Sequence, residues 1–427
     1  MKVLFYAAPG SGFNHTLHYR YTDVGEVLGY LSRRRPADRF GFLDGLACPV
    51  EWRLLREAAD ADLLVLFADI PSSPSLLRLA RYIRAVAPGV RIAVYGKATV
   101  RIPAYFSRPP IDAVHVDGDP EPALFAYLAH LDGGPVPPGI QLVDGPPAPP
   151  GIRLHPGEWG FPELSALPLD DYRRVARAKE IPFELSVYPS KGCPHTECRY
   201  CDAPRYEGTG DRRRDPEALI RWTDQAVTQY GFDCVQMHSP SFAADPDWIA
   251  EFRRSYRQAR AGFKWTCCTR TDTLTGESVE RMARAGCIRI GIGVETIPFG
   301  RNRGPKSTIE DLTEVARMTR AAGVTVKAYI MAGMPGQTER DLLYTYRVCR
   351  SLGFIPRVSA YTPFHALEGL SAEALDRIDL ARWDRKSYAG DTPVPHATVL
   401  RLAVRPEGID RWVDERLSRL TGDDPSP

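Results

Sequence analysis

The chain has 427 residues, more than one domain usually holds, so two or three domains are expected. Its 44% hydrophobic and 25% charged residues exclude a wholly disordered protein. The formal net charge of +2 is too balanced to indicate nucleic acid or an anionic membrane as the main partner. A run of about 18 apolar residues, which a transmembrane helix needs, is absent from the sequence. The first residues, MKVLFYAAPG, are interpreted as a β-strand rather than a signal peptide, which predicts a cytoplasmic protein.

Strand-like and helix-like segments alternate through the first 135 residues. Strands are expected at 2–8, 40–44, 61–68, 90–96 and 111–116, and helices at 22–34, 49–60, 75–87 and 121–131. Strands that alternate with helices form a parallel sheet covered on both faces. Residues 1–135 are therefore predicted to form an α/β doubly wound domain of flavodoxin or Rossmann type.

The rest of the chain divides into three further segments. Residues 136–180 are predicted to be a linker and lead-in, because proline and glycine crowd residues 132–151. Residues 181–365 hold about six β/α units, fewer than a closed eight-stranded barrel needs, which predicts a partial (β/α)6 barrel. Residues 366–427 are predicted to be a small C-terminal extension with helical pieces at 371–385 and 408–420.

Three of the nine cysteines, Cys193, Cys198 and Cys201, lie close together in the sequence SKGCPHTECRYCDAP. Their C-x4-C-x2-C spacing directly after an expected strand favours metal binding, whereas an odd cysteine count argues against a disulfide framework. Three thiolates suit a [4Fe–4S] cluster and leave one iron open for a small ligand. Structural zinc is the alternative, and it would need His195, Asp202 or a distant residue as a fourth ligand.

Four further stretches follow the cysteines in order: FKWTCCTRTDTL (263–274), RMARAGCIRIGIGVET (281–296), MAGMPGQTERDL (331–342) and YTPF (361–364). With the cysteine loop they resemble the radical S-adenosylmethionine (SAM) enzymes whose barrel follows a cobalamin-binding-type domain. The usual cysteine spacing in that family is C-x3-C-x2-C, so this loop carries one extra residue.

The resemblance implies a [4Fe–4S] cluster held by the three cysteines and a SAM molecule bound to its open iron. One-electron reduction, by a donor such as flavodoxin or ferredoxin, would cleave SAM to methionine and a 5′-deoxyadenosyl radical that abstracts hydrogen from a substrate. Tyr200 matches the position that packs on adenine, and the other implied SAM contacts are Ser239, Arg270, Glu295 and Gly333. Structural salt bridges are the alternative role for Arg270 and Glu295, and a turn is the alternative for Gly333.

The N-terminal domain resembles the cobalamin-binding fold, but its segment YGKAT (95–99) replaces a frequent Gly-Gly pair with bulkier residues, Tyr95 and Lys97. One hypothesis is that cobalamin binds and carries a methyl group to the substrate. The other is that the domain is a retained scaffold and the radical drives dehydration of a 1,2-diol, as in the radical SAM dehydratases of aminoglycoside antibiotic biosynthesis. Tyr95 and Lys97 favour the second hypothesis. A non-catalytic iron–sulfur or cobalamin-binding protein is a third.

The substrate is expected to be a polar small molecule, because polar residues follow or lie on the barrel strands. Among them, His238 is a candidate base, and Lys327 or Tyr329 a candidate proton donor to a departing hydroxyl. Side chains alternate along a strand, so only some of these residues can face the same side.

Overall fold

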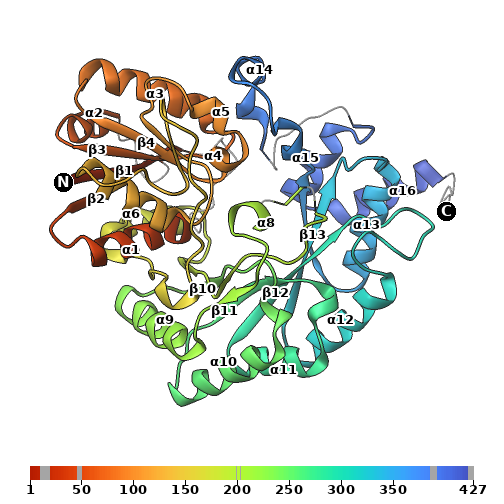
Figure 1. Cartoon of the computed structure of the whole chain (residues 1–427). Coiled ribbons are helices and arrows are strands. Elements are labelled where there is room, and N and C mark those ends of the chain that lie inside the picture. The colour runs from red at the N-terminus through yellow and green to blue at the C-terminus, as the bar shows by residue number, and fades with distance from the viewer. Residues whose placement is uncertain (10–19, 46–50, 199, 202, 385–391, 422–427) are drawn as a thin grey trace. The chain divides into compact units, whose positions relative to one another are not determined.

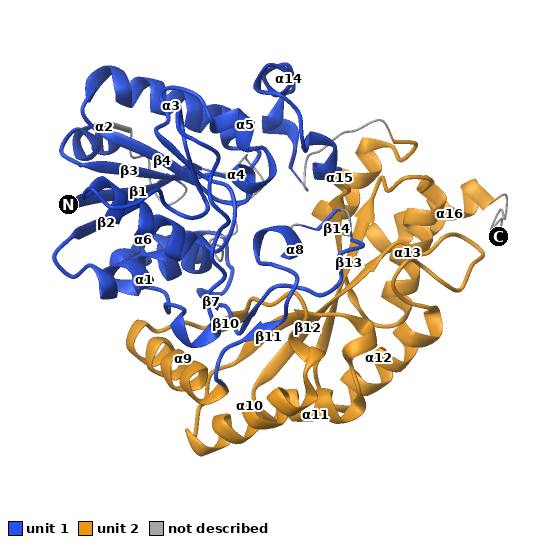
Figure 2. Cartoon of the chain, in the orientation of Figure 1, with its two compact units in different colours: residues 1–215, 363–384 blue, residues 216–362, 385–427 orange. Residues whose placement is uncertain are grey.

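The computed structural model describes residues 1–9, 20–45, 51–198, 200–201, 203–384 and 392–421. It divides into two compact units (Figure 2): unit 1 holds residues 1–215 and 363–384, and unit 2 holds residues 216–362 and 385–427. Among the described residues, no helix is long and apolar enough to cross a bilayer. The segment boundaries expected at 135, 180 and 365 remain a prediction.

Unit 1 contains a six-stranded sheet in the order β2-β1-β3-β4-β5-β6 (Figure 1). Its first five strands are parallel: β1 (Lys2–Ala7), β2 (Arg39–Asp44), β3 (Leu63–Phe67), β4 (Arg91–Tyr95) and β5 (Ala113–His115). Strand β3, LLVLF, is buried at every position, as expected of a parallel strand with both faces covered. The 2-1-3-4-5 order is that of flavodoxin-like sheets, so the predicted doubly wound fold is confirmed.

The helices of unit 1 cover both faces of this sheet. Helices α1 (Glu26–Arg34) and α6 (Pro120–Leu131) lie on one face, and α2 (Glu51–Ala59) and α3 (Ser73–Val86) on the other (Figure 1). A π-helical turn, η1 (Arg20–Gly25), precedes α1, so the helix expected at 22–34 is split between two geometries. Short helices α4 (Lys97–Arg101) and α5 (Pro103–Phe106) follow β4.

The proline-rich stretch expected to be a linker contributes a strand. Strand β6 (Ile140–Leu142) pairs antiparallel with β5 and extends the sheet by one strand. The rest of unit 1 comprises α7 (Leu169–Ala178), β7 (Glu184–Val187), β8 (Ser190–Lys191), α8 (Ala203–Tyr206), β9 (Arg212–Arg213) and α14 (Ala372–Asp376). Arg108 ties α14 to the sheet domain through a bidentate pair with Asp376, with both distances 2.6 Å.

Unit 2 repeats strand and helix in parallel order. Its strands are β10 (Cys234–Met237), β11 (Trp265–Thr269), β12 (Cys287–Glu295), β13 (Thr325–Ala332) and β14 (Ile355–Ala360), each paired with the next. The helices along the outer face are α9 (Pro216–Tyr230), α10 (Pro246–Gln258), α11 (Gly276–Arg284), α12 (Ile309–Ala321) and α13 (Glu339–Ser351) (Figure 2). Helices α15 (His396–Val404) and α16 (Ile409–Thr421) follow. The parallel β/α repeat is the one expected for the predicted partial barrel.

Candidate active site

The cysteine loop belongs to unit 1 and begins directly after β8. Cys193 is buried, whereas Cys198 and Cys201 are partly exposed, and all three are free thiols. The Cys201 N–H donates to the Cys198 carbonyl at 2.9 Å, which makes a tight turn around Tyr200. No three His, Cys, Asp or Glu side chains of the described residues converge on one metal ion. Three thiolates from one loop are a donor set that a [4Fe–4S] cluster takes, with each thiolate on a different iron.

The two ends of the cysteine loop are held together at its base. The Cys193 N–H donates to the Gly208 carbonyl at 3.0 Å, and the Gly192 N–H donates to a Glu207 carboxylate oxygen at 3.2 Å. Gly192 has φ +90°, and a Cβ built there would lie 1.9 Å from the Gly210 carbonyl oxygen. Only glycine permits this close approach. Glu207 was missed by sequence reasoning, because no motif marks it.

One face of the unit 2 sheet gathers half-buried polar side chains. On β13 the residues Val326, Ala328, Ile330 and Ala332 are buried, whereas the intervening Lys327 and Tyr329 are half-buried. Strand β14 repeats this alternation. In β10, β11 and β12 strand register places polar residues on the same side as Lys327, among them Thr266, which is buried. This polar face comprises Gln236, Thr266, Cys268, Arg289, Lys327, Tyr329, Arg357 and Ser359.

Strand register arranges the polar face in rows. Cys268 pairs with Gly291, and Gly291 pairs with Lys327. The Cys268 Sγ donates to the Tyr329 Oη at 3.6 Å, and burial raises the pKa of this thiol. A Cβ on Gly291 would lie 2.7 Å from a Tyr329 ring carbon, so the tyrosine ring packs directly on the backbone of Gly291. Two predicted residues, Lys327 and Tyr329, therefore share one face, and Cys268 joins them although sequence analysis did not select it.

Arg270 and Glu295 both have a charged neighbour in this structure. Arg270 follows β11 and makes a bidentate pair with Asp272, with distances of 2.9 and 2.6 Å. Glu295 ends β12 at φ +63° and accepts a hydrogen bond from Lys306 at 2.6 Å. Structural pairing, the alternative considered for both residues, is thus what the structure shows. Lys306 lies in the loop after β12, and no sequence signal identified it as the partner.

His238 and Ser239 follow β10 at the start of its loop. His238 is half-buried, and Ser239 is buried with its hydroxyl accepting the Ser241 N–H at 3.3 Å. Both residues lie directly beyond the carboxyl end of β10, where ligands of α/β proteins usually bind.

Gly333 opens the turn after β13, with φ +87°. The turn is closed by Gln337, whose side-chain oxygen accepts the Gly333 N–H at 2.6 Å and whose amide donates to the Met331 carbonyl at 2.8 Å. The same amide donates to the Thr296 hydroxyl at 2.9 Å, which ties the ends of β12 and β13 together. Gln337 is buried and was not selected from the sequence.

The carboxyl edge of the unit 1 sheet is where a doubly wound domain binds a ligand, at the switch point between β1 and β3. Tyr95, the last residue of β4, is fully buried there. Its ring packs edge-on against Phe67 and Phe5, with centroids 5.4 and 6.1 Å away, and its hydroxyl donates to the Asp23 carbonyl at 2.9 Å. Lys97 lies 3.6 Å from the Asp23 carboxylate. These side chains fill the space that a Gly-Gly pair would leave open.

Arg20 closes the same edge over β1 and β2. It is 6% exposed, donates to the Ala8 carbonyl at 2.8 Å, and lies 3.3 Å from an Asp44 carboxylate oxygen. The space that remains beside Asp23, Glu121 and Tyr206 has a volume of about 20 Å³, room for roughly one water. A corrin ring is many times larger. This cavity is therefore too small for a corrin ring, which favours the scaffold hypothesis over cobalamin binding.

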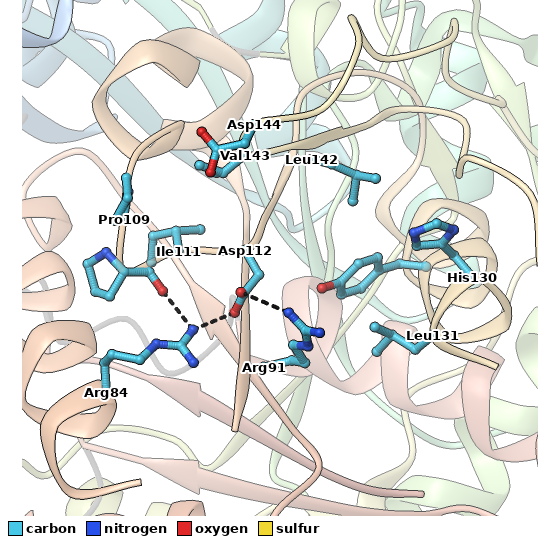
Figure 3. A pocket seen from close by; sticks show the side chains of 12 residues that line it. Arg84, Arg91, Pro109, Ile111, Asp112, His130, Leu131, Leu142, Val143 and Asp144 are labelled. Carbon is cyan, nitrogen blue, oxygen red and sulfur yellow. Dashed lines mark hydrogen bonds and ion pairs between the residues drawn. The ribbon is translucent and has the colours of Figure 1, made fainter. Parts of the chain in front are cut away.

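A larger cleft, of about 450 Å³, lies elsewhere in unit 1 (Figure 3). Arg84 and Arg91 both reach Asp112 across it, at 2.6 and 3.4 Å. Arg91 begins β4, and Asp112 directly precedes β5, so the cleft lies at the amino ends of the strands. That end is opposite the ligand-binding edge of doubly wound domains, and its arginines already have a carboxylate partner.

Residues 187–349 match the model of the radical SAM superfamily. Two curated relatives are the anaerobic magnesium-protoporphyrin IX monomethyl ester cyclases of Rubrivivax gelatinosus and Cereibacter sphaeroides. They are 24% and 23% identical over 229 and 231 residues, each match covering 52% of this chain. These matches span only 38% and 36% of the relatives' own lengths.

Two solved structures share the fold over most of the chain. The radical SAM methyltransferase TsrM from Kitasatospora setae, with tryptophan and a SAM analogue bound, superposes with TM-score 0.67 at 16% identity, covering 85% of this chain and 75% of TsrM. The cobalamin-dependent radical SAM enzyme OxsB, with aqua-cobalamin and SAM bound, gives TM-score 0.68 at 15% identity, covering 95% of this chain and 61% of OxsB. At these identities the likeness shows a shared fold.

Proposed function

We propose, on the premise that residues 187–349 form a radical SAM domain, that the protein cleaves SAM reductively and abstracts hydrogen from a polar small molecule. Radical SAM domains use a [4Fe–4S] cluster and SAM, which together supply a 5′-deoxyadenosyl radical. The reaction that we favour is the dehydration of a 1,2-diol in a natural-product substrate, for example an aminoglycoside-like sugar.

The polar face of unit 2 is the observation that supports this proposal. A partial barrel with a purely structural role would bury apolar side chains on both faces, but here Cys268, Lys327 and Tyr329 stay half-buried together. Lys327 or Tyr329 would protonate the departing hydroxyl. His238 would take the proton from the other hydroxyl, on the neighbouring carbon of the diol.

In the same proposal the cluster is held by Cys193, Cys198 and Cys201, and Tyr200 packs on the adenine of SAM. Ser239, Arg270, Glu295 and Gly333 are the proposed SAM contacts. Arg270 would exchange Asp272 for the SAM carboxylate, because a guanidinium binds either carboxylate with the same fork geometry. An electron donor of the flavodoxin or ferredoxin type and a cytoplasmic location belong to this proposal.

Cobalamin-dependent methyl transfer is the second candidate. The shared fold with TsrM and OxsB favours it. The buried Tyr95 and the closed edge around Arg20 favour dehydration instead, because they occupy the ligand-binding edge of the N-terminal sheet.

The first experiment tests SAM cleavage. After anaerobic reconstitution with iron and sulfide, the wild-type protein should bind iron and convert SAM to 5′-deoxyadenosine and methionine under reduction. Cys193→Ala should lose cluster and cleavage, while Cys234→Ala, which removes a buried thiol in β10, should retain both. Bound zinc instead of iron, or a reducible cluster without SAM cleavage, would contradict the proposal; the latter result would support a non-catalytic binding protein.

The second experiment separates dehydration from methyl transfer. Hydroxocobalamin is titrated into the reconstituted protein under equilibrium dialysis, and S-adenosylhomocysteine is measured beside 5′-deoxyadenosine. We expect no stoichiometric binding and no S-adenosylhomocysteine, followed by loss of one water from a member of a panel of amino polyols and polyol carboxylates. Tight cobalamin binding would make methyl transfer the leading function.

A further inference from the structure

The segment that leads into the cysteine loop is bound to the sheet domain by buried charges. Lys191 ends β8, two residues before Cys193, and is 6% exposed. Its Nζ lies 2.6 Å from Glu121 Oε1 and 3.3 Å from Glu26 Oε2. Both carboxylates are almost completely buried, at 1% and 0% exposure.

The segment that leaves the loop is bound in the same way. Arg212 on β9 pairs with Lys191 across the two-stranded β8–β9 sheet and makes a bidentate contact with Asp119, at 2.7 and 3.0 Å. Arg214 lies 3.2 Å from Glu26 and donates to the Tyr188 carbonyl at 2.7 Å. Three cations of the loop ends therefore face three carboxylates of the sheet domain.

The positions of these carboxylates explain why the domain can hold them. Glu26 begins α1, Asp119 is the N-cap residue of α6, and Glu121 lies in the first turn of α6. Helix N-termini at the carboxyl edge of a doubly wound sheet favour negative charge, and in such domains they commonly bind a ligand's phosphates. Here Asp119 and Glu121 take that place on α6. Glu26 instead follows the π-helical turn η1 and accepts the Tyr188 N–H at 3.3 Å. All three carboxylates bind the base of the cysteine loop.

Aromatic packing covers the cations of the network. The ring of Trp159, which is 2% exposed, lies 5.1 Å from the Lys191 amine and 5.1 and 5.4 Å from the guanidinium carbons of Arg214 and Arg212. Buried ion pairs of this kind add specificity of position, because any displacement leaves a charge uncompensated in a low-dielectric site.

We propose that Lys191, paired with Glu26 and Glu121, is a positioning residue that anchors the cysteine loop to the N-terminal domain. In this proposal the N-terminal domain fixes the position of the cysteine loop. The part of this proposal that concerns the cluster rests on the proposed function. The effect of Lys191 on the cysteine loop can be measured without a cluster.

The test uses the full chain in two states. In the cluster-free protein, the alkylation rate of each cysteine is followed by mass spectrometry. Lys191→Met should raise the rate at Cys193 by about tenfold through local opening, with buried Cys234 as the internal reference. In the reconstituted protein, the same variant should bind less iron and shift the midpoint potential and the electron paramagnetic resonance signal of the reduced cluster. Lys191→Arg should restore most of both properties.

A matched control is Arg84→Met, which breaks the 2.6 Å ion pair with Asp112 in the same unit but at the amino ends of the strands. It should leave Cys193 alkylation and cluster properties unchanged. If circular dichroism shows that Lys191→Met is misfolded, a double variant replaces it. This variant combines Lys191→Met with Glu121→Gln, which removes both charges, and it should still show faster alkylation of Cys193.

The proposal would be overturned if a folded Lys191 variant showed the wild-type alkylation rate at Cys193 and the wild-type midpoint potential. Misfolding of both variants would overturn it as well, since the network would then be a requirement of the whole domain. Failure of the wild-type protein to bind iron would instead count against the proposed function, and the alkylation contrast would still decide the anchor.

Discussion

At the scale of single residues, burial decides what a titratable group contributes. His115, on β5 of the unit 1 sheet, is fully buried. Burial, followed by the charge of Arg153, lowers the pKa of its imidazole from 6.5 to about 4. The unfolded chain binds a proton near pH 6.5, which the folded chain accepts only near pH 4. His115 therefore does not lower the free energy of unfolding above pH 6.5. As the pH falls toward 4, it lowers this free energy by up to about 3 kcal/mol.

His115→Leu should remove this pH dependence, since leucine has a similar volume and no proton to bind. Thermal melting of both proteins at pH 7 and pH 5 provides the measurement. The wild-type melting temperature should fall more between the two pH values than that of the variant. Equal falls would show that His115 does not titrate in this range.

At the scale of elements, a single side chain holds the turn between β13 and α13. Gln337→Ala would remove the acceptor of the Gly333 N–H and both donors to Met331 and Thr296. Buried polar groups left without partners cost about 1–3 kcal/mol each, so we expect unit 2 to lose roughly 3 kcal/mol of stability. Denaturant unfolding measures the loss, and Gln225→Ala on the exposed side of α9 is the control. A loss no greater than that of the control would contradict the role of Gln337.

At the scale of the whole molecule, residues far apart in the chain complete each unit. Helix α16 packs on α13, where Arg416 reaches Glu339 at 2.9 Å and Leu417 is 1% exposed. Leu417→Ala should cost about 2–4 kcal/mol, while Leu420→Ala, at a 37% exposed position of the same helix, should cost little. Hydrogen exchange should show the loss of protection in α13 and α16 and not in the unit 1 sheet. A loss spread over both units would contradict the division.

Patterns among neighbouring residues of the sequence determined the strands and helices of this protein and indicated its candidate cluster loop. Alternation of apolar segments with helix-like ones specified the parallel sheets, since a helix between two strands lets them pair in parallel. The cysteine spacing pointed to the metal-binding loop, and the ordered motifs pointed to a radical SAM domain, which the superfamily match confirms. Alternation along a strand predicted only that some of the polar candidates share a face, and the structure shows that Lys327 and Tyr329 are two that do.

The tertiary structure alone decided which groups meet. Strand β6 forms inside a proline-rich stretch because the edge of β5 offers it hydrogen bonds, a partner that composition does not indicate. Lys191 pairs with Glu26 and Glu121, and Glu295 pairs with Lys306, because packing brings charges from different segments together in a medium of low dielectric. Tyr95 was noted in the sequence for its bulk, but its burial between Phe5 and Phe67 closes the sheet edge only in the folded domain. Local sequence sets the elements, whereas long-range packing assigns partners to their polar groups.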